Sequence, residues 1–274
     1  MILEPAPAKI NLALHVRARR ADGYHELETL FAFLRDGDEI RVSPGSASFT
    51  IDGPFAAGLA TEGDNLVIRA VGLFSKAFEI TAEYKIILTK NLPIASGIGG
   101  GSADAAATLR ALARLNEIAL DDPRLFACAD ALGSDVPACL LGRSAIGMGR
   151  GEKLEPLDGL TGIPVLLVNP GVAVSTAAVF KNWDGRDHGP IGNGPLLDLA
   201  QAGRNDLEPA ARALAPVIGD VLDQLAKTAP VLARMSGSGA TCFALYASAA
   251  DRTHAAVAIR AHDPVWWCLE STLA

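Results

Sequence analysis

Four glycines within five positions, Gly97 and Gly99 to Gly101, lead directly into a segment rich in alanine and leucine. Glycine accepts positive φ angles and close approach by a ligand, and a chain tolerates its entropic cost mainly where it needs these properties. Leucines then recur every three residues at 109, 112 and 115, which is typical of a helix with one buried stripe. Backbone N–H groups at a helix start bind anions, above all phosphate. The stretch Lys90 to Leu115 therefore predicts a phosphate-binding loop followed by a helix.

The residue pattern of this loop excludes the two commonest kinds of phosphate-binding loop. No lysine follows the glycines, as a Walker loop requires, and Ser102 stands where a dinucleotide fingerprint has its third glycine. We expect Ser102 to be the helix N-cap and Asp104 to lie in the first turn, where a carboxylate interacts favourably with the helix dipole. A flexible linker before an ordinary helix is the alternative interpretation of the glycines.

Phosphoryl transfer depends on positioning the nucleophile and neutralising charge, so a carboxylate and a cation should accompany the loop. Asp135, in a Gly-Ser-Asp turn, is a candidate carboxylate, although this spelling more often marks a simple turn or cap. Lys9 is a candidate cation on a strand predicted from Lys9 to Arg17, where apolar residues alternate. Lys9, Asn11 and His15 would share the face opposite the apolar one. An isolated lysine on a strand is otherwise usually solvated.

Local signals place further elements that must position these residues. In the first half we expect a strand at 38–43, a helix from residue 64 with Asp64 as its cap, a strand at 84–89 that feeds the glycine loop, and a helix that Asp122 caps, Pro123 opens and Gly133 closes. In the second half we expect a buried strand at 163–168, a long loop at 183–195, a helical region from Asn205, a helix at 217–225, and a second glycine loop, 235–240, before a strand.

Composition narrows the class of protein. A chain of 274 residues, half of them apolar, can bury a large core, and a length prior of ~150 residues per domain favours two domains. The formal net charge of −7 argues against a nucleic-acid surface, which would be basic. The four cysteines are too scattered for a metal site or a disulfide framework and suit a reducing cytoplasm. The sequence shows no signal peptide and no apolar run of ~18 residues, so we expect a cytoplasmic protein without membrane contact.

The pattern P-x-x-x-G-[LI]-G-G-G-S, with Asp-Ala-Ala downstream, resembles the phosphate loop of the GHMP kinases, the family of galactokinase, homoserine kinase and mevalonate kinase. The triple glycine, the PAKINL segment and the ARRADGYHELET segment are more closely similar to the CDP-methylerythritol kinases within this family. One residue departs from the Ser-Ser pair that is usual in these kinases, because Ser102 is followed by Ala103.

The resemblance implies an α+β, two-lobed fold. Its N-terminal lobe, residues 1–155, would be similar to ribosomal protein S5 and bind ATP, and its C-terminal lobe, residues 156–274, would be a ferredoxin-like α/β sandwich. The implied reaction is ATP-dependent phosphorylation of the 2-hydroxyl of CDP-methylerythritol in the non-mevalonate isoprenoid pathway. ATP and Mg²⁺ are the implied cofactors; no metal ligand is assigned, and Ser102 is the nearest candidate.

The resemblance also implies roles for particular residues. Lys9 and Asp135 match the catalytic pair, in which the lysine keeps the aspartate ionised. Four further residues match positions that contact the phosphate acceptor, here called the acceptor side: Asn11, Tyr24, His25 and Thr176. There an aromatic ring can stack on cytosine and a histidine can pair with its edge. The ATP side comprises Asn65 and the loop residues Pro93, Ile94, Ala95, Ser96, Gly97, Ile98, Gly99, Gly100, Gly101, Ser102 and Ala103.

Two alternatives stay open from the residues. Another GHMP kinase, acting on mevalonate, homoserine or a sugar, would share the loop but not the DGYH segment. A non-catalytic nucleotide-binding regulator would keep the loop without needing both Lys9 and Asp135.

Overall fold

A computed structural model describes residues 1–57, 59 and 65–274 of the chain. These residues form two compact units, each built from segments that are far apart in the sequence. The predicted boundary between domains 1–155 and 156–274 stays a prediction. Unit 1 comprises Met1–Ala8, Asp36–Ile94 and Gly99–Gly142, and unit 2 comprises Lys9–Arg35, Ala95–Ile98 and Arg143–Ala274.

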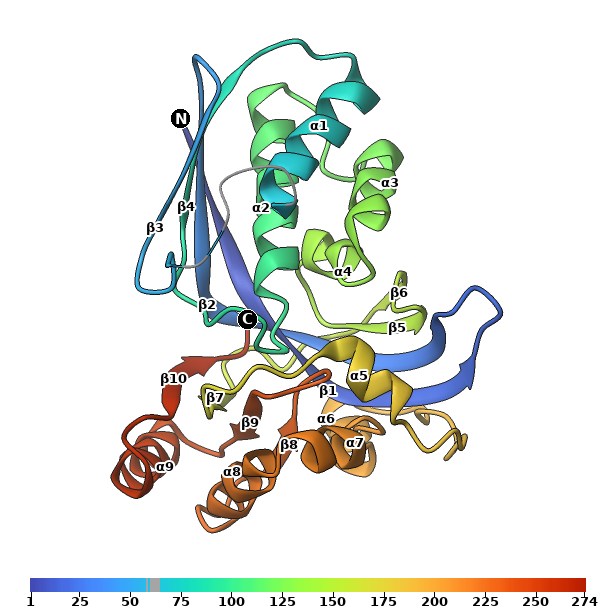
Figure 1. The fold of residues 1–274 in the computed structure, drawn as a ribbon, viewed down its shortest axis with the longest axis vertical. Helices are drawn as coiled ribbons and strands as arrows, with labels where there is room; N and C mark the ends of the chain where they lie inside the picture. The colour runs from blue at the N-terminus through green and yellow to red at the C-terminus, as the bar shows by residue number, and fades with distance from the viewer. Residues whose placement is uncertain (58, 60–64) are drawn as a thin grey trace. The chain divides into compact units, whose positions relative to one another are not determined.

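Unit 1 contains a sheet covered by helices. The second half of β2 (His25–Pro44) pairs antiparallel with β4 (Tyr84–Thr89), and β3 (Ser48–Asp52) pairs parallel with β4. The predicted strand at 84–89 is thus confirmed. Figure 1 shows the helices on one side of these strands, packed on one another. They are α1 (Leu66–Phe78), α2 (Gly100–Leu115), α3 (Pro123–Leu132) and α4 (Val136–Leu141).

The helix caps of unit 1 partly follow the sequence signals. Asp122 caps α3 by accepting the Arg124 N–H at 2.8 Å, and Gly133 ends the helix, as predicted. The cap of α1 is Asn65, whose Oδ1 accepts the Val67 N–H at 2.9 Å. The predicted cap, Asp64, lies outside the described residues.

Two predicted strands were too short. β1 runs over Ile2–Arg19 and β2 over His25–Pro44, instead of residues 9–17 and 38–43. β2 pairs with β4 through its second half and with β5 (Ala145–Gly149) through its first half, so one long strand serves two ladders. β1 pairs with β2 and is buried on both faces from Ala8 to Val16, which a polar alternation does not reveal.

Unit 2 contains an antiparallel sheet of strand order β10-β7-β9-β8. In chain order these strands are fourth, first, third and second, and helices follow the first and third, which is the ferredoxin-like arrangement. The strands are β7 (Pro164–Asn169), β8 (Leu232–Met235), β9 (Cys242–Leu245) and β10 (Trp267–Thr272). Outside this sheet, β5 pairs with β6 (Lys153–Pro156) as well as with β2.

The helices of unit 2 agree with the predicted helical region after Asn205 and with the helix at 217–225. Their apolar residues form one core with the sheet, in which Leu166, Val168 and Tyr246 are almost fully buried. The segment between residues 183 and 195 contains no helix or strand, as predicted. The helices are α5 (Thr176–Lys181), α6 (Leu196–Ala202), α7 (Glu208–Leu214), α8 (Val217–Ala226) and α9 (Ala249–His262).

Within the described part of the chain, no helix combines the length and apolar character that a membrane crossing needs. All four cysteines are free thiols; Cys128, Cys139 and Cys242 are buried and Cys268 is half-buried.

Candidate functional site

The glycine loop enters α2 three residues earlier than predicted. Gly99 is the N-cap, with a left-handed φ of 69° that glycine accepts without strain, and the helix begins at Gly100. Ser102 is therefore the third helical residue and not the cap. Asp104 lies beyond the first turn, so it does not serve the helix dipole as expected. The Ala103 N–H donates to the Gly99 carbonyl at 2.8 Å, which closes the first turn.

Asp104 instead belongs to a buried cluster of charges in unit 1. Lys90 Nζ donates to Asp104 Oδ2 at 2.8 Å and to Asp38 Oδ2. All three side chains are at most 5% exposed. Asp38 Oδ1 accepts the N–H groups of Asn91 at 2.5 Å and Leu92 at 2.8 Å, directly before the loop begins at Pro93. The cluster thus joins the chain before the glycine loop to the helix after it.

The cluster has two carboxylates for one ammonium. Burial raises the pKa of Asp104 to about 7, against the opposing attraction of Lys90, and the Asp38 carboxylate adds repulsion. Burial also disfavours the charge of Lys90, but the two carboxylates outweigh it, and the pKa of Lys90 is raised. Asp104 Oδ1 is buried and has no hydrogen-bond partner among the described residues. The second carboxylate is therefore held at an energetic cost.

Gly100 lies directly against this cluster. A Cβ at residue 100 would stand 2.9 Å from Lys90 Nζ and 3.6 Å from Asp38 Oδ2. A larger residue there must displace the buried ammonium from its carboxylates. Sequence reasoning placed Gly100 in the loop but missed Asp38 and Lys90 as supporting residues. Asp38 precedes Lys90 by 52 residues, so no local spacing connects them.

The middle of the loop, Ala95–Ile98, is held within unit 2. The Lys9 N–H donates to the Ile98 carbonyl at 3.0 Å, and the Thr241 N–H donates to the Ser96 carbonyl at 3.1 Å. Ser236 Oγ donates to the Gly97 carbonyl at 3.0 Å. Because these carbonyls accept hydrogen bonds from other segments, the loop backbone is held in one conformation.

The second glycine loop, Met235–Ala240, supplies much of that support. Gly97 has a φ of 78°, and a Cβ on it would stand 2.6 Å from the Gly239 carbonyl oxygen. The Asn205 side chain donates to the carbonyls of Met235 and Gly237, both at 2.8 Å. The structure thus brings together two glycine segments that are about 140 residues apart in the chain.

Lys9 and Asn11 lie together on β1, as the alternation predicted, but both are buried. Lys9 Nζ donates to Asn11 Oδ1 at 2.8 Å and stands 5.4 Å from the ring centroid of Phe31. Asn11 Nδ2 donates to Thr29 Oγ1 at 2.8 Å. The Asn11 N–H donates to Ser236 Oγ at 3.2 Å. These contacts fix the direction of the lysine side chain.

Two of the residues predicted to contact the phosphate acceptor, Tyr24 and His25, make ring contacts in unit 2. The His25 ring stacks on Phe180 with centroids 4.7 Å apart and meets the edge of Trp183 at 5.6 Å. Tyr24 is 51% exposed, and the Arg150 guanidinium stands 5.1 Å from its ring centroid. Tyr24 directly precedes His25 in the chain, and exposed aromatic faces of this kind can receive a planar ligand.

Sequence reasoning missed Phe180 and Trp183, although two aromatic residues three positions apart, shortly after Thr176, are a usable signal. Thr176 begins α5, and its Oγ1 lies 2.8 Å from Ser238 Oγ in the second glycine loop. Asp135 lies in unit 1 at the N-cap position of α4, half-buried. Its side chain makes no capping hydrogen bond to α4.

Comparison with known proteins gives the family. The pattern of the GHMP kinases N terminal domain matches residues 65–143, and that of the GHMP kinases C terminal domain matches residues 190–264. The 4-diphosphocytidyl-2-C-methyl-D-erythritol kinase of Rhizorhabdus wittichii is 55% identical over 98% of this chain and 94% of its own. That of Paracoccus denitrificans is 49% identical over 99% and 96%. The chain belongs to the GHMP kinases, and within them to this kinase family.

Solved structures agree. A crystal structure of 4-(cytidine 5'-diphospho)-2C-methyl-D-erythritol kinase superposes with a TM-score of 0.82 at 37% identity, covering 100% of this chain and 99% of that one. Homoserine kinase from Cytophaga hutchinsonii gives a TM-score of 0.71 at 20% identity, with 98% and 95% covered, which shows the shared fold alone. The predicted α+β GHMP kinase fold is confirmed, and the protein is a kinase that uses ATP.

Proposed function

We propose that the protein transfers the γ-phosphate of ATP to the 2-hydroxyl of 4-diphosphocytidyl-2-C-methyl-D-erythritol. The single structural observation that favours this acceptor is the stack of His25 on Phe180, with the exposed Tyr24 directly before His25 in the chain. A flat aromatic wall with a ring nitrogen suits a pyrimidine, because rings stack and cytosine has a hydrogen-bonding edge. The names of relatives 46–55% identical to this chain support the same acceptor.

In the proposed reaction the acceptor hydroxyl oxygen attacks the γ-phosphorus while the bond to the β–γ bridging oxygen breaks, and ADP leaves. Asp135 orients the hydroxyl and takes its proton. Lys9 supplies a fixed positive charge, and Asn11 holds its ammonium. Thr176 contacts the acceptor. Catalysis then depends on position and charge rather than on a covalent intermediate.

The loop Pro93–Ala103 is proposed to hold the ATP phosphates through backbone N–H groups, with Asn65 near the base. Mg²⁺, when bound, neutralises phosphate charge and keeps several waters. Hard oxygen donors suit this ion, and Ser102, in the first turn of α2, is the nearest candidate ligand. ATP use and four free thiols support a cytoplasmic location.

A competition assay tests the acceptor. The protein and ATP are offered CDP-methylerythritol, methylerythritol phosphate, mevalonate and homoserine, and the products are separated by mass. We expect phosphorylation of the cytidylyl compound only. Preference for another acceptor would leave a GHMP kinase with a different substrate, and no turnover of any acceptor would favour a nucleotide-binding regulator.

A further inference from the structure

The segment Trp183–Ile191, here named the strap, follows α5 and has no secondary structure. Most of its residues are exposed, and only Trp183, Gly189 and Ile191 are half-buried. These three positions, together with Asp187, are where the strap is attached to the rest of unit 2. Asp184 and Asp187 accept N–H groups two residues further along, from Arg186 at 2.9 Å and Gly189 at 2.8 Å, which shapes the strap into tight turns.

The strap runs along the strands that carry the acceptor-side residues. The Ile191 N–H donates to Glu28 Oε2 on β2 at 2.7 Å. Arg17 on β1 pairs with Asp187 at 3.0 Å and with Glu28 at 3.1 Å, so one guanidinium joins the strap to both strands. Trp183 contacts His25 at the other end. The strap is thus attached to both sides of the turn that contains Tyr24.

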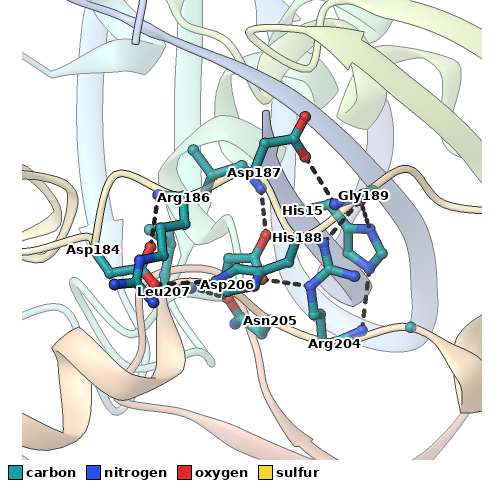
Figure 2. A network of polar contacts seen from close by, with 12 residues as sticks. His15, Asp184, Arg186, Asp187, His188, Gly189, Arg204, Asn205, Asp206 and Leu207 are labelled. Atoms are coloured by element: carbon teal, nitrogen blue, oxygen red, sulfur yellow. Dashed lines mark hydrogen bonds and ion pairs between the residues drawn. The ribbon is translucent and has the colours of Figure 1, made fainter. Parts of the chain in front are cut away.

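Its strongest attachment is a buried one at Gly189 (Figure 2). The Gly189 carbonyl accepts from His15 Nδ1 at 3.0 Å and from Arg204 Nη2 at 2.8 Å. The Arg204 N–H donates to His15 Nε2 at 3.2 Å. Because Nε2 accepts, the proton of the neutral ring must be on Nδ1, where it is donated to Gly189. His15 is 2% exposed.

Arg204 is itself held firmly against β1. Its carbonyl accepts the Leu14 N–H at 2.8 Å, and its Nε pairs with Asp206 Oδ1 at 2.6 Å. Asp206 Oδ2 accepts the Val16 N–H at 2.8 Å. The donors that converge on Gly189 therefore come from a rigid part of unit 2.

The surroundings of His15, chiefly its burial, favour the neutral form of the ring. Burial and then the Arg204 guanidinium lower its pKa, while the Gly189 carbonyl, Asp206 and Glu28 oppose them. A second proton on Nε2 would face the Arg204 N–H, so the attachment requires the uncharged ring.

The attached strap also fixes aromatic rings. Trp183 begins the strap three residues after Phe180, and both rings contact His25. The indole Nε1 is buried without a hydrogen-bond partner among the described residues. Such an unpaired donor is costly, so attachment elsewhere must hold the tryptophan in place.

We propose that the strap is a positioning element for the acceptor nucleotide, and that His15 and Arg204 are the positioning residues that latch it through the Gly189 carbonyl. This inference rests on the proposed function. Loosening the latch lets Phe180 and Trp183 move from His25, which weakens acceptor binding and leaves the ATP side and the chemical step unchanged. It predicts a larger KM for the cytidylyl substrate at unchanged kcat and unchanged KM for ATP.

The test uses a double variant. His15→Gln keeps a hydrogen-bond acceptor near the Nε2 position but loses the donor to Gly189. Arg204→Lys keeps the positive charge but loses the guanidinium N–H that donates to Gly189. His15→Asn, which can retain a donor near Nδ1, and Arg186→Lys, on an exposed part of the strap, are the matched controls. Hydrogen exchange of the Ile191 amide reports attachment without any substrate. We expect roughly 10-fold faster exchange in the double variant, as suits two lost hydrogen bonds, and about a 10-fold larger KM for the acceptor.

The exchange rate and the acceptor KM together decide the proposal. Faster exchange with a larger acceptor KM alone supports it, and near-normal controls strengthen it. Unchanged exchange would overturn the latch, and faster exchange with an unchanged acceptor KM would overturn the strap's role. If the double variant does not fold, Asp187→Asn, which removes the charge that pairs with Arg17 and keeps an amide oxygen for the Gly189 N–H, is tested by the same two measurements. If the protein does not phosphorylate a cytidylyl acceptor, the proposed function fails, while the exchange data still decide the latch.

Discussion

Replacing Lys90 by methionine should be among the most destabilising single changes in unit 1. The substitution keeps most of the side-chain volume and removes the ammonium between Asp38 and Asp104. The exposed fractions of the Lys90, Asp38 and Asp104 side chains are 4%, 0% and 5%, so water cannot replace the lost charge. Removing one partner of a buried ion pair costs about 3–5 kcal/mol. At about 2–4 °C per kcal/mol for a chain of this size class, the melting temperature should fall by roughly 6–20 °C at pH 8.

The cluster's excess carboxylate gives this prediction a second part. Asp104→Asn removes a charge that the site barely supports, because burial raises the pKa of Asp104 to about 7. It should therefore cost far less than Lys90→Met, and the double variant should be more stable than Lys90→Met alone. Lys85→Met, at an exposed position of β4, is the matched control and should change stability by less than about 0.5 kcal/mol.

The pH dependence of thermal stability provides a third test of the same cluster. In the folded state the Asp104 carboxyl keeps its proton up to about pH 7, whereas its ordinary pKa is 3.8. The folded state therefore binds more protons between these values, and the contribution of Asp104 to stability falls as pH rises through that window. Thermal melts from pH 4 to 8 should show this slope in the wild type and lose it in Asp104→Asn. A Lys90→Met protein that melts like the wild type at pH 8 would refute the reasoning.

The remaining predictions concern the reaction. Gly100→Val should abolish ATP binding in calorimetry, because its side chain displaces Lys90 Nζ, while Gly72→Val, which has open space on α1, should bind normally. Asp135→Asn should lower kcat by ~10²-fold or more with nearly unchanged substrate affinities, and full activity would remove the carboxylate from the mechanism. Tyr24→Ala should raise the KM for the cytidylyl substrate by roughly one to two decades with little change for ATP, since a stacked base is worth ~1–3 kcal/mol. Equal KM values in variant and wild type would show that Tyr24 does not read the base.

Local signals predicted the elements whose causes are local. The cap at Asp122, the proline at 123 and the glycine at 133 act within one helix, and the structure confirms all three. The glycine loop before a helix was also predictable, because glycine spacing and alanine content act over neighbouring residues. Its start was misplaced at Ser102, since a left-handed glycine can end a loop as well as a hydroxyl cap can.

Residues whose roles depend on distant partners were not predictable. Lys90 and Asp38 belong to no local motif in their strand-like segments, and only the folded chain brings them together. His15 was placed on the polar face of β1, but its partners, Gly189 and Arg204, lie more than 170 residues away. Periodicity gave the face of the strand, whereas the burial of that face is a property of the packed unit.

The position of Lys90 also explains how a phosphate loop can lack the lysine of a Walker loop. Lys90 precedes the loop and is the nearest described cation to Gly100, yet both of its observed contacts are to carboxylates. Its charge is balanced by the Asp38 carboxylate, and its other contact is to the carboxyl group of Asp104, so it offers little net attraction to an anion. Its contacts instead fix the two ends of the loop. In the proposed site the ATP phosphates would therefore be held by the backbone N–H groups of the helix start. Gly100→Val is accordingly expected to act by displacing Lys90, and not by changing the charge at the loop.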